Sequence, residues 1–173
     1  MPTLPPSSES PNAMQNRQVL DATSAVLSSL NLLRPGAVPS LRYPHGLLAP
    51  GTWPATSVSG PSILSLTGLA PNATILPALT LAATSEATEV RNLTIGDLIV
   101  RAGSKPILFT GTVHTGTILI EAGAQVAFLG VDFAGPATAI NNAGLAADVL
   151  VSGAIKRNAV AHVNATVTGE LVV

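Results

Sequence analysis

A glycine-punctuated repeat in the second half of the chain constrains the fold more than any other feature. Residues 98–103 (LIVRAG) return twenty positions later as residues 118–123 (ILIEAG). Residues 111–116 (GTVHTG) are matched by residues 130–135 (GVDFAG) at an offset of nineteen. Apolar and glycine positions are kept, whereas the charged position in the first pair changes sign. A period near twenty, built from short apolar runs with glycine corners, predicts a solenoid whose stacked turns bury their faces on one another.

Short apolar runs continue the pattern on both sides of this repeat. Residues 106–109 (PILF) align with residues 126–129 (VAFL) at an offset of twenty, and residues 163–169 can be laid on residues 129–135 at an offset of 34. Other runs are rich in Val, Ile, Leu and Thr and are bounded by Gly, Asn, Asp or Pro; they lie at residues 63–66, 74–76, 93–95 and 149–151. Strands this short, with no helical segments between them, are not typical of a doubly wound fold or of a sandwich. The sequence therefore predicts an all-β domain over residues 63–173, a parallel β-helix of roughly five turns at roughly 20 residues per turn.

Residues 1–62 are expected to form a separate N-terminal region. Residues 1–12 are rich in Pro and Ser, which predicts an extended arm that a partner subunit holds in place. From about residue 13 to residue 33 the sequence predicts one α-helix, which the proline and glycine at positions 35 and 36 end. Residues 34–62 contain six prolines, which predicts a connector laid over a surface.

The predicted helix carries an apolar stripe with alternating steps of four and three residues. That spacing is typical of a short coiled-coil seam. Two interpretations stay open: the helix caps the open end of its own solenoid, or it packs around an oligomer axis. In the connector, a tryptophan within a Pro-rich loop is more often an anchor in a neighbour's pocket than a ligand platform. The predicted partner-binding residues of the arm, helix and connector are Pro5, Pro6, Val19, Val26, Leu30, Leu33, Tyr43 and Trp53.

Composition argues against several classes of function. A net charge of −1 and only two lysines offer no basic field for nucleic acid. No apolar run approaches the roughly 18 residues of a membrane span, and the first residues resemble no secretory leader. The chain has no cysteine, and His45, His114 and His162 lack the short spacing of metal-binding motifs. We expect no cofactor, no metal, no nucleic acid and no membrane.

The acidic residues do not suggest catalysis. Glu121 and Arg101 hold equivalent positions on neighbouring turns, and neighbouring strands lie about 4.8 Å apart, which predicts a solvated salt bridge. Asp132 and His114 are eighteen residues apart and nearly equivalent, so they could pair on one edge of the solenoid. Glycoside hydrolysis needs two carboxylates about 5 to 9.5 Å apart, and no such pair is evident. No catalytic residue is predicted, and the chain is not expected to be an enzyme.

About half of the chain, residues 93–173, resembles the short right-handed β-helices of virion proteins from tailed bacteriophages. The resemblance rests on LIVRAG and ILIEAG, on residues 137–144 (ATAINNAG) and on residues 163–173 (VNATVTGELVV). It implies a right-handed β-helix in a threefold assembly, either as a knob or cement that clamps capsid subunits or as part of a tail spike or fibre. No catalytic residue carries over from it.

These observations predict a structural virion protein. The expected role is a homotrimeric capsid decoration or cement protein on the capsid surface, bound to the major capsid protein or another virion protein, and cytoplasmic during assembly. Alternatives are a tail spike, fibre or baseplate module, a β-helix that binds or cleaves polysaccharide, and a cellular scaffold that polymerises end to end.

Overall fold

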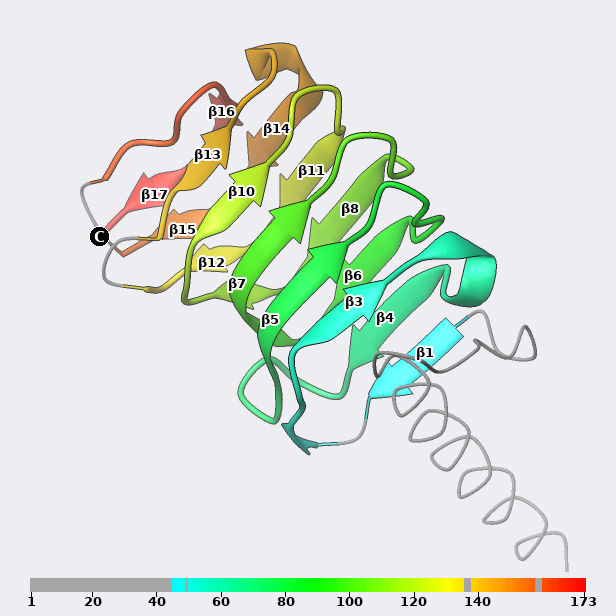
Figure 1. The fold of residues 1–173 in the computed structure, drawn as a ribbon. Helices are drawn as coiled ribbons and strands as arrows, with labels where there is room; N and C mark the ends of the chain where they lie inside the picture. The colour runs from blue at the N-terminus through cyan, green and yellow to red at the C-terminus, as the bar shows by residue number, and fades with distance from the viewer. Residues whose placement is uncertain (1–44, 49, 136–137, 158–159) are drawn as a thin grey trace, which may run out of the picture.

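The residues that the structure describes fold as a parallel β-solenoid of about six turns with almost no helix (Figure 1). This computed structural model describes residues 45–48, 50–135, 138–157 and 160–173. The all-β, parallel β-helical fold predicted from the repeat is confirmed. The arm, the helix and the first part of the connector (residues 34–44) lie outside the described residues, and with them the predicted residues Pro5, Pro6, Val19, Val26, Leu30, Leu33 and Tyr43.

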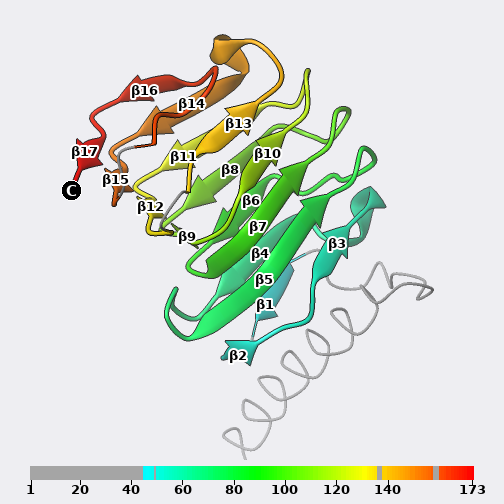
Figure 2. The same cartoon turned by 60° about the vertical axis from the view of Figure 1, so that its left-hand side comes forward.

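The strands form two sheets that face each other across the core (Figures 1 and 2). Sheet A has seven strands, in the spatial order β1 (His45–Leu48), β4 (Ser65–Gly68), β6 (Glu89–Arg91), β8 (Ile107–Thr110), β11 (Val126–Leu129), β14 (Val149–Ser152) and β16 (Thr166–Thr168). Every neighbouring pair in this sheet is parallel. Each step along sheet A is therefore one turn of the solenoid.

Sheet B has ten strands, because two long early strands give way to pairs of short ones. Strand β5 (Thr74–Leu81) pairs with β2 (Gly51–Thr52), β3 (Thr56–Val58) and β7 (Thr94–Val100). In the next turn the two halves of β7 pair with β9 (Val113–His114) and β10 (Ile118–Ile120). The later strands are β12 (Asp132–Phe133), β13 (Ile140–Asn142), β15 (Ile155–Lys156) and β17 (Leu171–Val172). Single 3₁₀ turns at η1 (Gly60–Ser62) and η2 (Ala146–Asp148) are the only helical elements in the described segments.

The observed register confirms most of the sequence repeat and corrects one part of it. Ile118 pairs with Leu98 at the predicted offset of twenty, and β12 pairs with β9 at the predicted offset of nineteen. The alignment of residues 106–109 with 126–129 was wrong by one residue, because Val126 pairs with Ile107. The cause is the corner before each strand: residues 101–106 separate β7 from β8, whereas only residues 121–125 separate β10 from β11.

Both ends of the solenoid also differ from the sequence prediction. The alignment of residues 163–169 with residues 129–135 was wrong, because β16 pairs with β14 at an offset of sixteen. The last turn is therefore short. At the other end, β1 to β3 already belong to the two sheets, ahead of the expected domain start at residue 63. Prolines at positions 50 and 54 do not prevent this, because they lie just outside the strands, where no ladder hydrogen bond is lost.

The core consists of columns of inward-facing side chains, one from each turn. In sheet A, Val90, Phe109, Phe128 and Val151 stand in register and are fully buried. The rings of Phe109 and Phe128 stack with their centroids 5.1 Å apart. Because parallel stacking puts equivalent positions directly above one another, apolar side chains pack on apolar side chains along this column.

One corner of every turn from β6 onward uses the left-handed backbone region. The residue after each sheet A strand has a positive φ; in order these are Asn92 (54°), Gly111 (56°), Gly130 (58°), Gly153 (60°) and Gly169 (64°). Glycine adopts this conformation without a Cβ penalty, and asparagine is the other residue that tolerates it. The repeated glycine of the sequence is therefore a backbone requirement.

We predict that Gly130→Ala lowers the free energy of unfolding by about 1–2 kcal/mol, the cost of a Cβ in the left-handed region. No atom lies within 4 Å of a Cβ built at this position, so the loss comes from the backbone and not from a clash. Gly130→Asn is the matched control and should lose less, because Asn92 occupies the same corner two turns earlier. Urea unfolding of the three proteins measures the difference. Equal losses for Ala and Asn would contradict the explanation.

Candidate functional site

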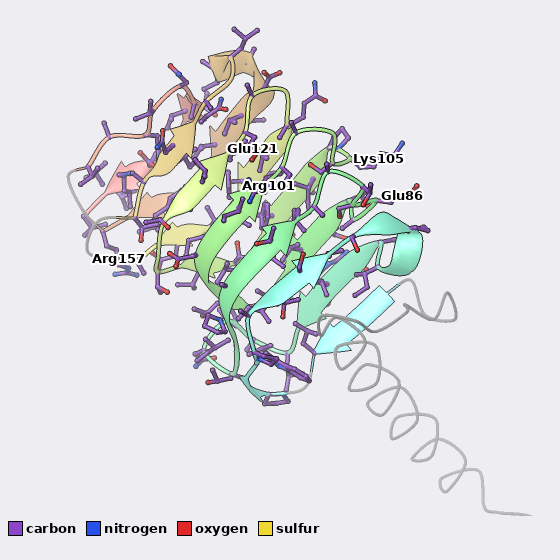
Figure 3. The ribbon with its side chains drawn as sticks, in the orientation of Figure 1. Glu86, Arg101, Lys105, Glu121 and Arg157 are labelled. Atoms are coloured by element: carbon purple, nitrogen blue, oxygen red, sulfur yellow. The ribbon has the colours of Figure 1, made fainter. Side chains whose placement is uncertain are left out.

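Outward-facing charges tie neighbouring turns together. Arg101 and Glu121 form the predicted salt bridge on adjacent turns (Figure 3). The Ala102 N–H donates to the same carboxylate at 2.9 Å. The hydrogen bond from Arg101 and then the one from Ala102 hold the pKa of Glu121 below its ordinary value. A second contact between neighbouring turns joins Thr117 to Asp97. Thr117 donates to the Asp97 carboxylate through both its backbone N–H (2.8 Å) and its hydroxyl (2.7 Å).

The expected pairing of His114 with Asp132 was wrong. Asp132 stands beside Val113 in the ladder, while His114 stands beside Phe133, so the two side chains point to opposite faces. The Asp132 carboxylate instead accepts three hydrogen bonds from Arg157, at 3.1, 3.1 and 2.9 Å. A shift of one residue in register reverses the direction of every side chain in a strand, which is why near-equivalence in sequence was not sufficient.

His114 is a core residue. Its ring is fully buried and packs edge-on against Phe109 and Phe128, with centroids 5.5 and 5.3 Å away. The ring Nε2 lies 3.1 Å from the hydroxyl of Thr112. Burial lowers the pKa of His114 from 6.5 to about 3. The ring is therefore neutral at pH 7, enclosed by apolar groups, and out of reach of any substrate.

A shallow apolar groove runs over the outer face of sheet A. Its volume is about 480 Å³, and its floor includes Leu108, Ala127 and Leu150 from three successive turns. The rim carries Thr88, Gln125 and Asp148. The outward column of sheet A is thus apolar over β8, β11 and β14, where a solvated sheet face would normally present polar side chains.

The last turn holds a cluster of ionisable side chains, which we call the polar floor: Lys156, His162 and Glu170. Lys156 occupies the inward position that Phe133 holds one turn earlier and is almost fully buried. Its Nζ lies 3.4 Å from the carbonyl oxygen of Thr138 and 3.3 Å from Nδ1 of His162. Burial lowers the pKa of Lys156, and the charge of Glu170 opposes that shift.

Hydrogen bonds on both sides of the His162 ring define its neutral form. Nδ1 accepts the backbone N–H of Ile140 at 2.9 Å, so the ring proton is on Nε2, which lies 2.7 Å from Oε1 of Glu170. Burial lowers the pKa of His162, an effect that the Glu170 hydrogen bond opposes and the nearby Lys156 charge reinforces. A neutral imidazole between an ammonium and a carboxylate gives the polar floor no net charge.

Two asparagines bind the last turns to each other beside the polar floor. The buried Asn142 donates from Nδ2 to the carbonyl oxygens of Leu145 (2.9 Å) and Asn164 (2.8 Å). Asn164 returns a hydrogen bond to the Asn142 carbonyl at 3.2 Å. These reciprocal bonds satisfy buried polar groups at the point where regular strand pairing ends.

Of the predicted partner-binding residues, the structure describes only Trp53. Its side chain is partly buried against the core of its own chain, and its backbone N–H donates to the Ile75 carbonyl at 2.8 Å. Its proposed role as an anchor in a neighbour stays a prediction. The other seven predicted residues lie outside the described parts of the chain.

Sequence reasoning missed the groove and the polar floor for different reasons. The groove consists of ordinary Leu, Ala and Pro side chains whose outward direction depends on an exact register. The polar floor joins Lys156 to His162 and Glu170, which lie six and fourteen positions further along. A usable sign was Lys156 itself, because a lysine aligned with the inward Phe133 indicates a turn with a polar interior.

The described segments contain no group of three or more His, Cys, Asp or Glu side chains that could hold a metal ion. Within the same segments, no helix has the length and apolar character needed to cross a membrane. Comparison of the chain with protein-family models, with curated proteins and with solved structures finds no match.

We predict that the protein loses stability as the pH falls below about 6.5. In the unfolded state His114 then binds a proton, whereas burial keeps His114 of the folded state unprotonated until about pH 3. One such histidine gives a slope of up to about 1.4 kcal/mol per pH unit. The double variant His114→Leu/Thr112→Val removes the ring without leaving the buried hydroxyl unpaired. Its free energy of unfolding should fall less between pH 7 and pH 5 in urea titrations. An unchanged fall would show that His114 is not the cause.

Proposed function

We propose that this protein is a structural interaction protein, and most concretely a homotrimeric capsid decoration or cement protein that clamps capsid subunits on a virion surface. The observation that carries the proposal is the apolar groove on the outer face of sheet A. It offers a flat, weakly charged surface to another protein and has no enclosed volume for a small molecule. Contact areas of this kind are typical of protein interfaces with few charges at the centre.

The solenoid supports such a role because it is a rigid spacer. Its turns are held by continuous parallel ladders and by inter-turn ion pairs such as Arg101–Glu121 and Arg157–Asp132. The floor of the groove is built on the same ladders, so it keeps its shape when a partner binds. Pre-formed surfaces lose little conformational entropy on association.

The winding and the assembly belong to the same proposal. We infer right-handed winding, because crossover connections between parallel strands of one sheet are right-handed in about 98% of cases. The threefold state rests on the apolar stripe of residues 13–33 and on the resemblance to short phage β-helices. In this scheme the arm of residues 1–12 grips the shell or a sister subunit, and the solenoid projects from it.

The groove prediction is tested by Leu150→Glu. The side chain is 40% exposed on the groove floor, so the variant should fold normally while its buried charge weakens attachment to the shell. Leu119→Glu is the matched control, since Leu119 is 37% exposed on β10 of sheet B. Occupancy on purified native particles, measured by quantitative mass spectrometry, should fall for Leu150→Glu only. Equal occupancy of the two variants would remove the groove as the attachment surface.

The arm prediction is tested by deleting residues 1–12. Occupancy on the particle should fall while the circular dichroism and the thermal midpoint of the solenoid stay unchanged, because the strands of both sheets lie within residues 45–173. The copy number of the full chain in the same particles decides the location. Hundreds of copies per particle support cement, whereas a few copies at one vertex, or none, would contradict it.

A further inference from the structure

The C-terminal end of the solenoid exposes apolar side chains that the fold elsewhere buries. Val167 continues the buried column of Phe128 and Val151, and Val172 continues the column of Phe133 and Lys156. Every residue of β16 and β17 is nonetheless exposed, and these strands lie at the far end of the molecule from β1 (Figure 2). The large apolar side chains exposed on this end, which we call the C-terminal pole, are Val163, Val167, Leu171, Val172 and Val173.

The backbone at the C-terminal pole is also incompletely paired. Leu171 and Val173 donate to Ala154 and Lys156 of the preceding turn, at 2.9 and 2.8 Å. Because successive backbone groups of a strand alternate in direction, the N–H and C=O of Val172 face away from the solenoid. Val167 is placed in the same way in β16, between two residues paired with β14. No other described strand covers the outer edge of β16 or β17, which leaves two templates for strand addition.

A hollow of about 320 Å³ opens at the C-terminal pole, with Val167 and Val172 in its wall and the polar floor of Lys156, His162 and Glu170 at its base. Glu170 is the only charged side chain in residues 160–173, and it is mostly buried against His162. The side chains on the exposed rim of the pole are therefore uncharged. A twofold contact brings each group close to its own copy, so it needs a surface without uncompensated charge.

We propose that the C-terminal pole is a self-association surface, on which a second copy of this chain docks pole to pole about a twofold axis. The axis runs normal to the two sheets. Strands β16 and β17 of one copy then pair antiparallel with the same strands of the other, centred on Val167 and Val172. Both sheets continue across the junction, and the four valines fill the shared hollow.

This contact makes a closed pair and not a filament, because an isologous interface uses the same surface of both copies. It is independent of the proposed attachment to a capsid and of any assembly formed by residues 1–44. Whatever unit those residues form, pole-to-pole contact joins two such units.

The absence of native cysteine allows a direct test of register in the full chain. In the proposed pairing Val172 lies opposite its own copy, so Val172→Cys should form an intermolecular disulfide in the presence of oxidised glutathione. Leu171→Cys is the control, because that residue is equally exposed (62% against 59%) but lies opposite Val173. Its own copy lies beyond the roughly 7 Å between Cα atoms that a disulfide can span. Faster cross-linking of Val172→Cys supports the proposal, and equal or slower cross-linking overturns it.

A second variant tests the contact without a covalent bond. Val172→Asp places two like charges at the centre of the junction, and light scattering after size exclusion should give half the wild-type mass. Leu69→Asp, in an exposed turn between β4 and β5, should keep the wild-type mass. Circular dichroism checks that both variants are folded. Equal masses for wild type and Val172→Asp across the concentration range would overturn the proposal, including the case in which another protein covers the pole.

Discussion

Parallel register between successive turns is the constraint on which the rest of the structure depends. Each residue stands above its counterpart from the previous turn, so one choice of inward residue determines what its neighbours can be. Phe109 packs on Phe128, and Leu98 on Ile118. The same register holds Arg101 against Glu121 outside the sheet. A corner must also return the chain to the same direction in every turn, which explains the left-handed residue after each sheet A strand from β6 onward.

The sequence was sufficient for the fold class because this constraint leaves a visible period. The copies at residues 98–103 and 118–123 correctly predicted two stacked turns. The exchange of Arg101 for Glu121 correctly predicted a salt bridge between them. Details that depend on corner length could not be predicted in the same way. One residue fewer before β11 than before β8 shifted the alignment by one, and a shift of one residue exchanges inside for outside. The match of Asp132 with His114 is a separate error, since the predicted offset of nineteen already sets Asp132 beside Val113. The groove and the polar floor depend on which side of a strand each residue faces, so neither could be seen.

The ionisable side chains of the described residues divide between the core, the outer face of the solenoid and the polar floor. His114 is sealed among phenylalanine rings, and burial keeps it neutral. Outward-facing charged side chains pair with each other between neighbouring turns, as in Arg101–Glu121 and Arg157–Asp132. The groove on the outside of sheet A is floored by Leu108, Ala127 and Leu150, side chains whose contribution to binding comes from burial of area. These observations support the proposed contact with another protein.

The C-terminal pole combines a polar inward layer with an outer layer of exposed valines. Lys156 and Asn142 replace the inward Phe133 and Ile120 of the previous turn, so the apolar core stops. The next level nevertheless returns to valine, at Val167 and Val172. If that level were simply a solvated cap, polar residues would be expected there, because exposed valines gain nothing from burial. The charge of Lys156 in the preceding turn is compensated by Glu170, whereas Val167 and Val172 lack a covering layer within the described chain. The exposed valines of the pole are therefore matched by another apolar layer, which the proposed second copy would supply, and not by a charged surface.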